Sequence, residues 1–391
     1  MDQLLEDAQS LFEYTRSLRR DFHQHPELGF KEVRTANIVA KELSNLGLEV
    51  KTGVGETGVV GLLEGKTAGP VILLRFDMDA LPIMEQTGAE YASLNDGVMH
   101  ACGHDSHVAI GLTVARLLNQ RRSSFNGTVK LMFQPAEEGL GGAPRMIADG
   151  VLQDPKPDIT LAMHVWNEKP VGWLGIAPGP VMAAADTFHI HLTGKGGHGA
   201  SPQYTVDPVV AAAQLVNALQ TIVSRNISPL QTAVVTIASI HSGEAFNVIP
   251  GDAVLQGTMR TFETTVRQRM ITRFSQIVED IAHAFGCEAR YEINSITPTL
   301  VNDPEVTRRV QAVAGKLLPQ EELDIHAVTT GSEDMAYVQQ QIPGCYIFVG
   351  SANHEKGLDA PHHSAKFDID ESIFPKAAGL LAASALEFLG K

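Results

Sequence analysis

The sequence is short of several features that particular classes of protein need. Its three cysteines, Cys102, Cys287 and Cys345, cannot all be paired, which argues against a disulfide framework and makes the cytoplasm the expected location. No apolar run approaches the roughly 18 to 20 residues that span a bilayer, and the acidic N-terminus is unlike a signal peptide. Basic residues are also outnumbered, with Lys+Arg 30 against Asp+Glu 45. Neither nucleic acid nor an anionic membrane is therefore an expected partner.

The length and composition are those of a folded globular protein with more than one core. A chain of 391 residues is too long for one ordinary domain and suits two domains, or one large domain with an insertion. Hydrophobic residues make up 44% and charged residues 19%, and Gly 35 with Pro 20 implies many tight turns.

The two ends of the chain have the sequence pattern of an α/β domain. Helical periodicity predicts helices over 4–27, 32–46 and 107–120, and later near 303–317 and from Glu371 onward. Nearly continuous apolar runs predict buried strands at "GVVGLLEG", "VILLRF", "TVKLMF", "ITLAMHV" and "CYIFVG". We expect a mixed sheet with helices on both faces, built from 1–185 and 298–391.

The segment 186–297 has a different pattern of helices and strands. From about Asp186 the pattern reads strand, helix, strand, strand, helix, strand, beginning with the alternating run "DTFHIHLTG". This order is the split βαβ unit, which forms a small ferredoxin-like α+β domain by itself. The sequence thus predicts that 186–297 is a domain inserted into the α/β domain.

Side chains able to bind metals follow the predicted strands of the α/β domain. Ligands bind at such strand ends in open α/β sheets, and thiol, imidazole and carboxylate groups are the protein ligands of divalent transition metals. The candidates are Asp77, Asp79, Cys102, His104, Glu137, Glu138, His164, His362 and His363. Each has an ordinary structural explanation alone, but their joint placement favours a metal site.

The roles within this set follow from residue chemistry. Cys102 is interpreted as a metal ligand; a thiol nucleophile is the alternative, but it leaves the paired glutamates and the distant histidines unexplained. The adjacent Glu137 and Glu138 point in different directions, so one can bind a metal while the other acts as general base. More candidate ligands are present than one tetrahedral ion needs, which favours two metals.

Eight motifs resemble those of a known enzyme family. In chain order they are "HQHPELGF", "DMDALP", "HACGHDSH", "QPAEEG", "GKGGHGASP", "FNVIP", "GTMRTF" and "GSEDMAY". Their order and approximate spacing are similar to those of the two-metal aminoacylase and carboxypeptidase G family. The branch is that of bacterial N-acyl-amino-acid amidohydrolases, hippurate hydrolase and plant indole-acetyl-amino-acid hydrolases.

The resemblance implies a residue for each role. The metal ligands would be Cys102, His104, Glu138, His164 and His363. His363 is preferred to His362 because the family's ligand precedes a Ser directly and a Phe by four residues. Glu137 would be the general base and His198 a histidine that reaches the scissile carbonyl across a dimer, while Asn247 and Arg260 would hold the substrate carboxylate. The family's His-x-Asp is here Asp77-Met78-Asp79, so one metal-binding histidine is absent.

The resemblance also implies an activity and partners. It implies a metal-dependent amidohydrolase that cleaves N-acyl-amino acids with two divalent ions, zinc or else Mn, Co or Ni. The inserted domain would be a lid that makes a homodimer or higher homo-oligomer. A metallocarboxypeptidase or dipeptidase acting on short peptides is the nearest alternative, and a catalytically silent binding protein and a thiol hydrolase are others.

Overall fold

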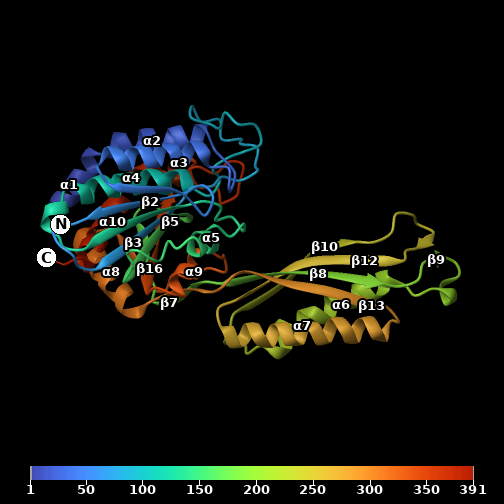
Figure 1. Cartoon of the computed structure of the whole chain (residues 1–391). Coiled ribbons are helices and arrows are strands. Elements are labelled where there is room, and N and C mark those ends of the chain that lie inside the picture. The colour runs from blue at the N-terminus through green and yellow to red at the C-terminus, as the bar shows by residue number, and fades with distance from the viewer. Residues whose placement is uncertain (1, 391) are drawn as a thin grey trace. The chain divides into compact units, whose positions relative to one another are not determined.

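The computed structural model describes residues 2–390, which form two compact units (Figure 1). The α/β unit consists of 2–181, Val301–Val328 and 334–390, and the inserted unit of Met182–Leu300 with Thr329–Glu333. In the described part of the chain, no helix has both the length and the apolar character needed to cross a membrane.

The α/β unit is built on a mixed eight-stranded sheet. The strand order is β1-β2-β4-β3-β5-β16-β6-β15, in which β4, β3, β5 and β16 run parallel and β1, β2 and β6 are antiparallel to their inner neighbours. The strands are β1 Glu49–Val54, β2 Gly58–Glu64, β3 Val71–Asp77, β4 Thr128–Gln134, β5 Ile159–Pro170, β6 Trp173–Gly175, β15 Glu322–Asp324 and β16 Gly344–Ala352.

Helices cover both faces of this sheet, as predicted. Phe76 of β3 packs against Gly111 of α4, while its neighbour Arg75 points to the opposite face. There Arg75 binds Asp334, whose carboxylate accepts from the amide of Ala143 in α5. The helices are α1 Asp2–Ser10, α2 Phe12–Gln24, α3 Val33–Asn45, α4 His104–Asn119, α5 Gly142–Ala148, α8 Pro304–Leu317, α9 Met335–Gln339 and α10 Phe374–Phe388.

Two details of the predicted elements are wrong. The single helix expected over 4–27 is interrupted at Leu11, whose amide donates to Ala8 in a tighter turn between α1 and α2. His164 was expected near the end of its strand, but β5 continues to Pro170 because it stays paired with β16 beyond that point.

The inserted unit is a four-stranded antiparallel sheet with two helices on one face. The order β10-β12-β8-β13, with α6 after β8 and α7 after β12, is the βαββαβ topology expected from the chain order. β8 and β12 alternate buried and more exposed residues, so one face carries the core under α6 and α7. The bounds are β8 Ala184–Thr193, α6 Pro208–Thr221, β10 Ala233–His241, β12 Asp252–Thr261, α7 Thr264–Ala284 and β13 Glu288–Thr297.

Two short strand pairs complete the fold. β9 (Gly197–His198) pairs with β11 (Val248–Ile249) at the end of the inserted unit where β12 begins. β7 (Gly179–Met182) pairs with β14 (Leu300–Asn302) where the chain leaves and re-enters the α/β unit.

Candidate metal centre

The turn into α4 places Cys102 and His104 at one edge of the large sheet. Gly103 between them has φ +88, and a Cβ there would lie 2.4 Å from a methyl carbon of Val165, so glycine is required. His104 is buried, and its Nδ1 lies 2.9 Å from the carbonyl oxygen of Asp79. Its Nε2 is buried without a hydrogen-bond partner among the described residues, as expected of a nitrogen that binds a metal.

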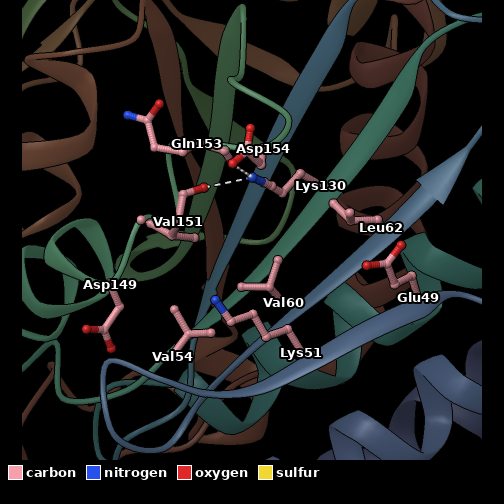
Figure 2. Close-up of a pocket in the computed structure, with 11 residues that line it drawn as sticks. Glu49, Lys51, Val54, Val60, Leu62, Lys130, Asp149, Val151, Gln153 and Asp154 are labelled. Atoms are coloured by element: carbon pink, nitrogen blue, oxygen red, sulfur yellow. Dashed lines mark hydrogen bonds between the residues drawn. The ribbon is translucent and has the colours of Figure 1, made fainter.

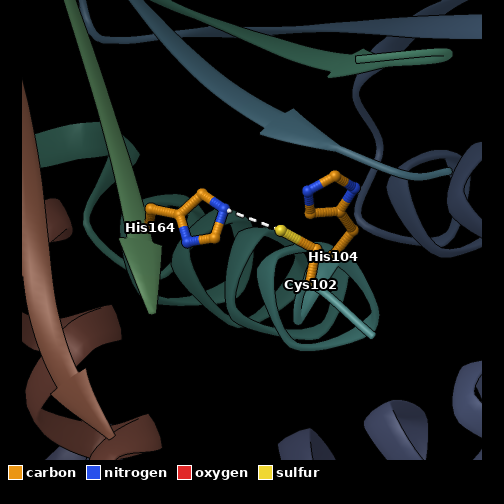
Figure 3. A group of neighbouring side chains, drawn as sticks. All are labelled: Cys102, His104 and His164. Atoms are coloured by element: carbon orange, nitrogen blue, oxygen red, sulfur yellow. Dashed lines mark hydrogen bonds between the residues drawn. The ribbon is translucent and has the colours of Figure 1, made fainter. Parts of the chain in front are cut away.

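His164 of β5 completes one donor group with these two residues. Its Nδ1 lies 2.6 Å from the carbonyl oxygen of Val165, which leaves Nε2 facing the Cys102 sulfur at 3.5 Å. In Figure 3 the sulfur lies between the rings of His164 and His104. The three donor atoms lie within 4.8 Å of one another, a spacing that one ion can bridge.

A second donor group shares the same thiol. Cys102, Glu138 and His363 also bring their donor atoms within 4.8 Å of one another, and His363 Nε2 lies 3.2 Å from Glu138 Oε1. Glu138 Oε1 is buried and faces the His363 ring. Two donor groups that share one sulfur could together hold two ions.

The backbone around this group is strained. His363 has φ +64 and Ala136, shortly before the glutamate pair, has φ +52. Non-glycine residues adopt such values at a cost of about 1–3 kcal/mol, and they cluster where function requires a particular side-chain direction.

Glu137 lies beside this centre, and its carboxylate is held by a backbone amide. Its carboxylate belongs to a donor group with His104 and Glu138, and its Oε1 accepts a hydrogen bond of 3.3 Å from the amide of Asp334. Asp79 joins the two donor groups, since its carboxylate lies 3.2 Å from His104 Nδ1 and accepts from the amide of Glu138 at 3.0 Å. The sequence analysis named Asp79 among the metal-binding candidates without a specific role, and its contacts are those of a residue that orients neighbouring groups.

The electrostatics of the cluster favour a bound cation. Burial works against charge on His104, but the carboxylates of Asp77, Asp79 and Glu138 outweigh it and raise its pKa to about 10. Burial, with Glu138 and Glu137, raises the pKa of the Cys102 thiol well above its usual range. Because excess negative charge holds protons on these donors, divalent ions would displace them and satisfy the same carboxylates.

The other polar residues of "VMHACGHDSH" have structural contacts. His107 is used at both nitrogens, with Nδ1 2.5 Å from Asp77 Oδ1 and Nε2 accepting from the amide of Val165 at 3.0 Å. Asp105 accepts from Arg19 at 2.9 Å, inside the unit. His100 is buried with neither ring nitrogen hydrogen-bonded within the described chain, and burial lowers its pKa to about 4. The contacts of His107 and Asp105 are structural.

The predicted residues of the inserted unit fall into two places. His198 and Asn247 are exposed and lie together, because β9 pairs with β11 and the amide of Gly199 donates to the Asn247 carbonyl. Arg260 is half-buried near the far end of β12, and burial lowers its pKa. At ~3.3 Å per residue, the eight steps from Asp252 to Arg260 span roughly 26 Å. Asn247, beside the β9–β11 pair, and Arg260 therefore lie toward opposite ends of the unit's sheet.

A separate cavity in the α/β unit has a structural explanation. It measures about 230 Å³ and lies between β1, β2, β4 and the segment 149–154 (Figure 2). Lys130 projects into it, but its ammonium donates to the carbonyls of Val151, Gln153 and Pro155 at 2.9, 2.5 and 2.9 Å. All three donors of the lysine are thus used in holding this segment to the sheet.

Comparison with known proteins yields matches over the whole chain. Residues 73–387 match the model of peptidase family M20/M25/M40. Thermostable carboxypeptidase 1 of Saccharolobus solfataricus is 40% identical, covering 100% of this chain and 99% of that protein, and N-acetyl-L-cysteine deacetylase of Bacillus subtilis is 41% identical, covering 95% and 87%. A dinuclear metal binding peptidase of the M20 family from Bacillus subtilis superposes with a TM-score of 0.84 at 34% identity, covering 97% and 99%.

Proposed function

This chain belongs to peptidase family M20/M25/M40 and is a metal-dependent amidohydrolase, and we propose that it cleaves N-acyl-amino acids into a carboxylate and a free amino acid. The observation that carries the proposal is the pair of donor groups that share the Cys102 thiol, with Glu137 beside them. The similarity to a deacetylase of an N-acetylated amino acid, over 95% of this chain, supports the substrate class.

Two divalent ions would be held by Cys102, His104, Glu138, His164 and His363. When bound they would supply Lewis acidity to the amide carbonyl and make water a better nucleophile. A thiol among the donors favours zinc, and Mn, Co and Ni remain candidates because geometry and supply also decide occupancy.

The protein's own residues would move the protons and stabilise charge. Glu137 would accept a proton from the attacking water and later deliver it to the departing amine, and the Asp334 amide would keep its carboxylate in place. His198 would donate a hydrogen bond to the carbonyl oxygen as negative charge develops there. Arg260 and Asn247 would bind the substrate carboxylate, Arg260 through its forked guanidinium.

The inserted unit is proposed to act as a lid in a homodimer. The separation of Asn247 from Arg260 along the unit supports this, since two copies would allow the two residues to serve one substrate from different subunits. In a closed dimer each copy would give His198 and Asn247 to its partner's site and use its own Arg260.

A substrate panel tests the activity. Metal-stripped protein would be reloaded with Zn, Mn, Co or Ni and assayed on acetyl-, benzoyl- and indole-acetyl-amino acids and on dipeptides. We expect the acylated amino acids to be hydrolysed best; hydrolysis of dipeptides alone would favour the carboxypeptidase or dipeptidase alternative, which similarity to a thermostable carboxypeptidase supports. No hydrolysis with any metal would refute both.

A mixing experiment tests the shared site. Glu137→Gln and His198→Ala are each expected to be nearly inactive. If His198 serves the partner's site, half of the randomly mixed dimers are hybrids with one intact site, so about a quarter of the wild-type activity returns. If His198 serves its own subunit, none returns.

The expected ligand is a small N-acyl-amino acid or short peptide, and the proposed location is the cytoplasm. Cys102, Cys287 and Cys345 are all free thiols, which supports a reducing compartment.

A further inference from the structure

The adjacent histidines of "HHS" have opposite surroundings. His363 is half-exposed toward Glu138, with its Nε2 3.2 Å from the carboxylate oxygen. The Nε2 of His362 instead accepts a hydrogen bond of 3.1 Å from the backbone amide of Asn167. In a neutral ring one nitrogen accepts and the other carries the hydrogen, so the hydrogen of His362 is on Nδ1. That Nδ1 faces the Cys102 sulfur at 3.8 Å.

The residue that sets this tautomer is itself held on several sides. The side-chain amide of Asn167 is buried and donates to the carbonyls of Ala360 at 2.7 Å and Asp368 at 3.1 Å. Its oxygen accepts from Ser351 Oγ at 3.0 Å. Three contacts with the stretch 351–368, distant from Asn167 in the sequence, therefore fix the backbone amide that binds His362.

The ring of His362 is also held by neighbouring rings. Its centroid lies 5.2 Å from His164, 5.2 Å from Trp166 and 5.0 Å from Phe367. A ring that is packed on these sides and hydrogen-bonded at Nε2 has little freedom to turn, so the direction of its Nδ1–H is set before any metal binds.

We propose that His362 is a positioning residue for the metal centre, donating its Nδ1–H to the Cys102 thiolate. The inference rests on the proposed function through the assignment of Cys102 as a ligand. A hydrogen bond to an ionised sulfur is charge-assisted, so it fixes the direction of the sulfur and draws electron density from it. β5 thus contributes to both ligands, His164 directly and Cys102 through Asn167 and His362.

The same contacts argue against His362 as a ligand itself. Binding a metal through Nδ1 would move the hydrogen to Nε2, where it would meet the N–H of Asn167 with no acceptor between them. A second acceptor for Nδ1–H is the backbone carbonyl of Cys102, which hydrogen-bonds to the ring. The experiment must therefore report on the sulfur.

Cobalt spectroscopy of two isosteric variants makes that distinction. In His362→Asn the amide nitrogen takes the place of Nδ1 and keeps a donor toward the sulfur. In His362→Gln the amide takes the place of Nε2, keeping the contact with Asn167 and losing the donor. The full-length protein would be loaded with Co²⁺, and the sulfur-to-cobalt charge-transfer band and the Co²⁺ affinity would be measured for each.

We expect His362→Gln to shift the band to longer wavelength and to weaken Co²⁺ binding ~10-fold or more, the usual effect of losing a partner of a metal ligand. His362→Asn is expected to keep the wild-type band and affinity. His363→Asn, the neighbouring control, should instead lower the number of Co²⁺ ions bound.

Equal bands and affinities in wild type and His362→Gln would overturn the proposal, as would equal shifts in both His362 variants, because either result means that the donor toward sulfur is not what matters. A wild-type protein that binds Co²⁺ without a thiolate band would overturn it together with the assignment of Cys102 as ligand. Absence of hydrolysis beside a normal band would instead refute the activity alone.

Discussion

Arg19 and Arg75 of the α/β unit are fully buried among carboxylates, whereas Arg267 of the inserted unit remains 29% exposed beside Asp186. The difference extends to the predicted functional groups. Those of the metal centre each have a partner that sets their direction, such as Asp79 for His104 and Val165 for His164. His198 and Asn247 are exposed at the end of a two-stranded pair.

This comparison separates two ways of building a site. A metal needs its donors in place before it binds, and buried hydrogen bonds provide that order at the cost of dehydrating charges. Groups that must meet a substrate on closure have to stay accessible until it arrives. In the proposed enzyme, the α/β unit would therefore carry the prearranged part of the site, and the inserted unit would carry the part that is completed on binding.

The largest expected effect comes from removing the shared thiol. Cys102→Ser should lose bound metal and activity, because both donor groups contain its sulfur. Cys287→Ser, on the inserted unit, is the matched control and should keep both. Metal content by elemental analysis and turnover of an acylated amino acid measure the outcome; full occupancy and turnover in Cys102→Ser would contradict the assignment.

Breaking the buried charge network should strongly destabilise the α/β unit. Arg19→Met leaves Asp105, Asp368 and Glu371 without their common partner, and the loss of one side of a buried pair costs about 3–5 kcal/mol of unfolding free energy. Urea unfolding followed by tryptophan fluorescence reports on this unit, because Trp166 and Trp173 both lie in it.

Two further arginine variants, at less buried ion pairs, serve as comparisons for Arg19→Met. Arg267→Met should destabilise the inserted unit less, since water reaches that pair; because this unit has no tryptophan, its unfolding would be followed by far-UV circular dichroism. Arg308→Met, an exposed pair on α8, should change little. A loss in Arg308→Met as large as that in Arg19→Met would show that burial does not explain the difference.

The exposed histidine of the inserted unit should matter for rate and not for stability. His198→Ala is expected to lower kcat ~100-fold to 1000-fold, the usual effect of losing a donor to a developing oxyanion. Metal content and unfolding midpoint should stay at wild-type values. His241→Ala, an exposed histidine on β10, should leave kcat unchanged; a loss of metal in His198→Ala would place that residue in the prearranged part of the site.

The smallest expected effect is an acid dependence of the α/β unit. Burial works against the charge of Asp370, but Lys356, the Ser372 amide and Asn353 outweigh it and lower its pKa to about 2. A depressed carboxyl pKa stabilises the fold above its unfolded value and loses that contribution as pH falls from about 4 to about 2. Asp370→Asn should cost ~1 kcal/mol at pH 7, with the difference shrinking toward pH 2. Urea unfolding across this pH range tests it, and a constant difference would refute it.

Much of the architecture could be predicted because it depends on local patterns. Continuous apolar strands indicated a sheet covered on both faces, and alternation after Asp186 indicated the βαββαβ order, and both are found. The end of β5 was mispredicted because its length depends on pairing with β16, more than 170 residues away. The roles of Glu137, His198, Asn247 and Arg260 stay predictions that the proposed experiments test.

The part of the site that could not be predicted depends on contacts between distant segments. Asp79 was a candidate whose orienting role was not predicted, and Asn167 carried no recognisable motif, yet both orient groups at the centre. Their partners lie 25 and 195 positions away in the chain. The residues next to Asn167 in the sequence give no sign of its contact with His362.

The sequence by itself determined which reactive side chains are present. They are a thiol, imidazoles and paired carboxylates after the strands of one α/β domain, in the order of a known family. Only the tertiary structure decided which nitrogen of each histidine is available. In His104 and His164, Nδ1 has a backbone partner, so Nε2 is the nitrogen available to a metal. His107 has partners at both nitrogens. In His362, Nδ1 faces the Cys102 sulfur. The reason is that an imidazole's free nitrogen is whichever one its neighbours leave unbonded, and those neighbours come from other strands.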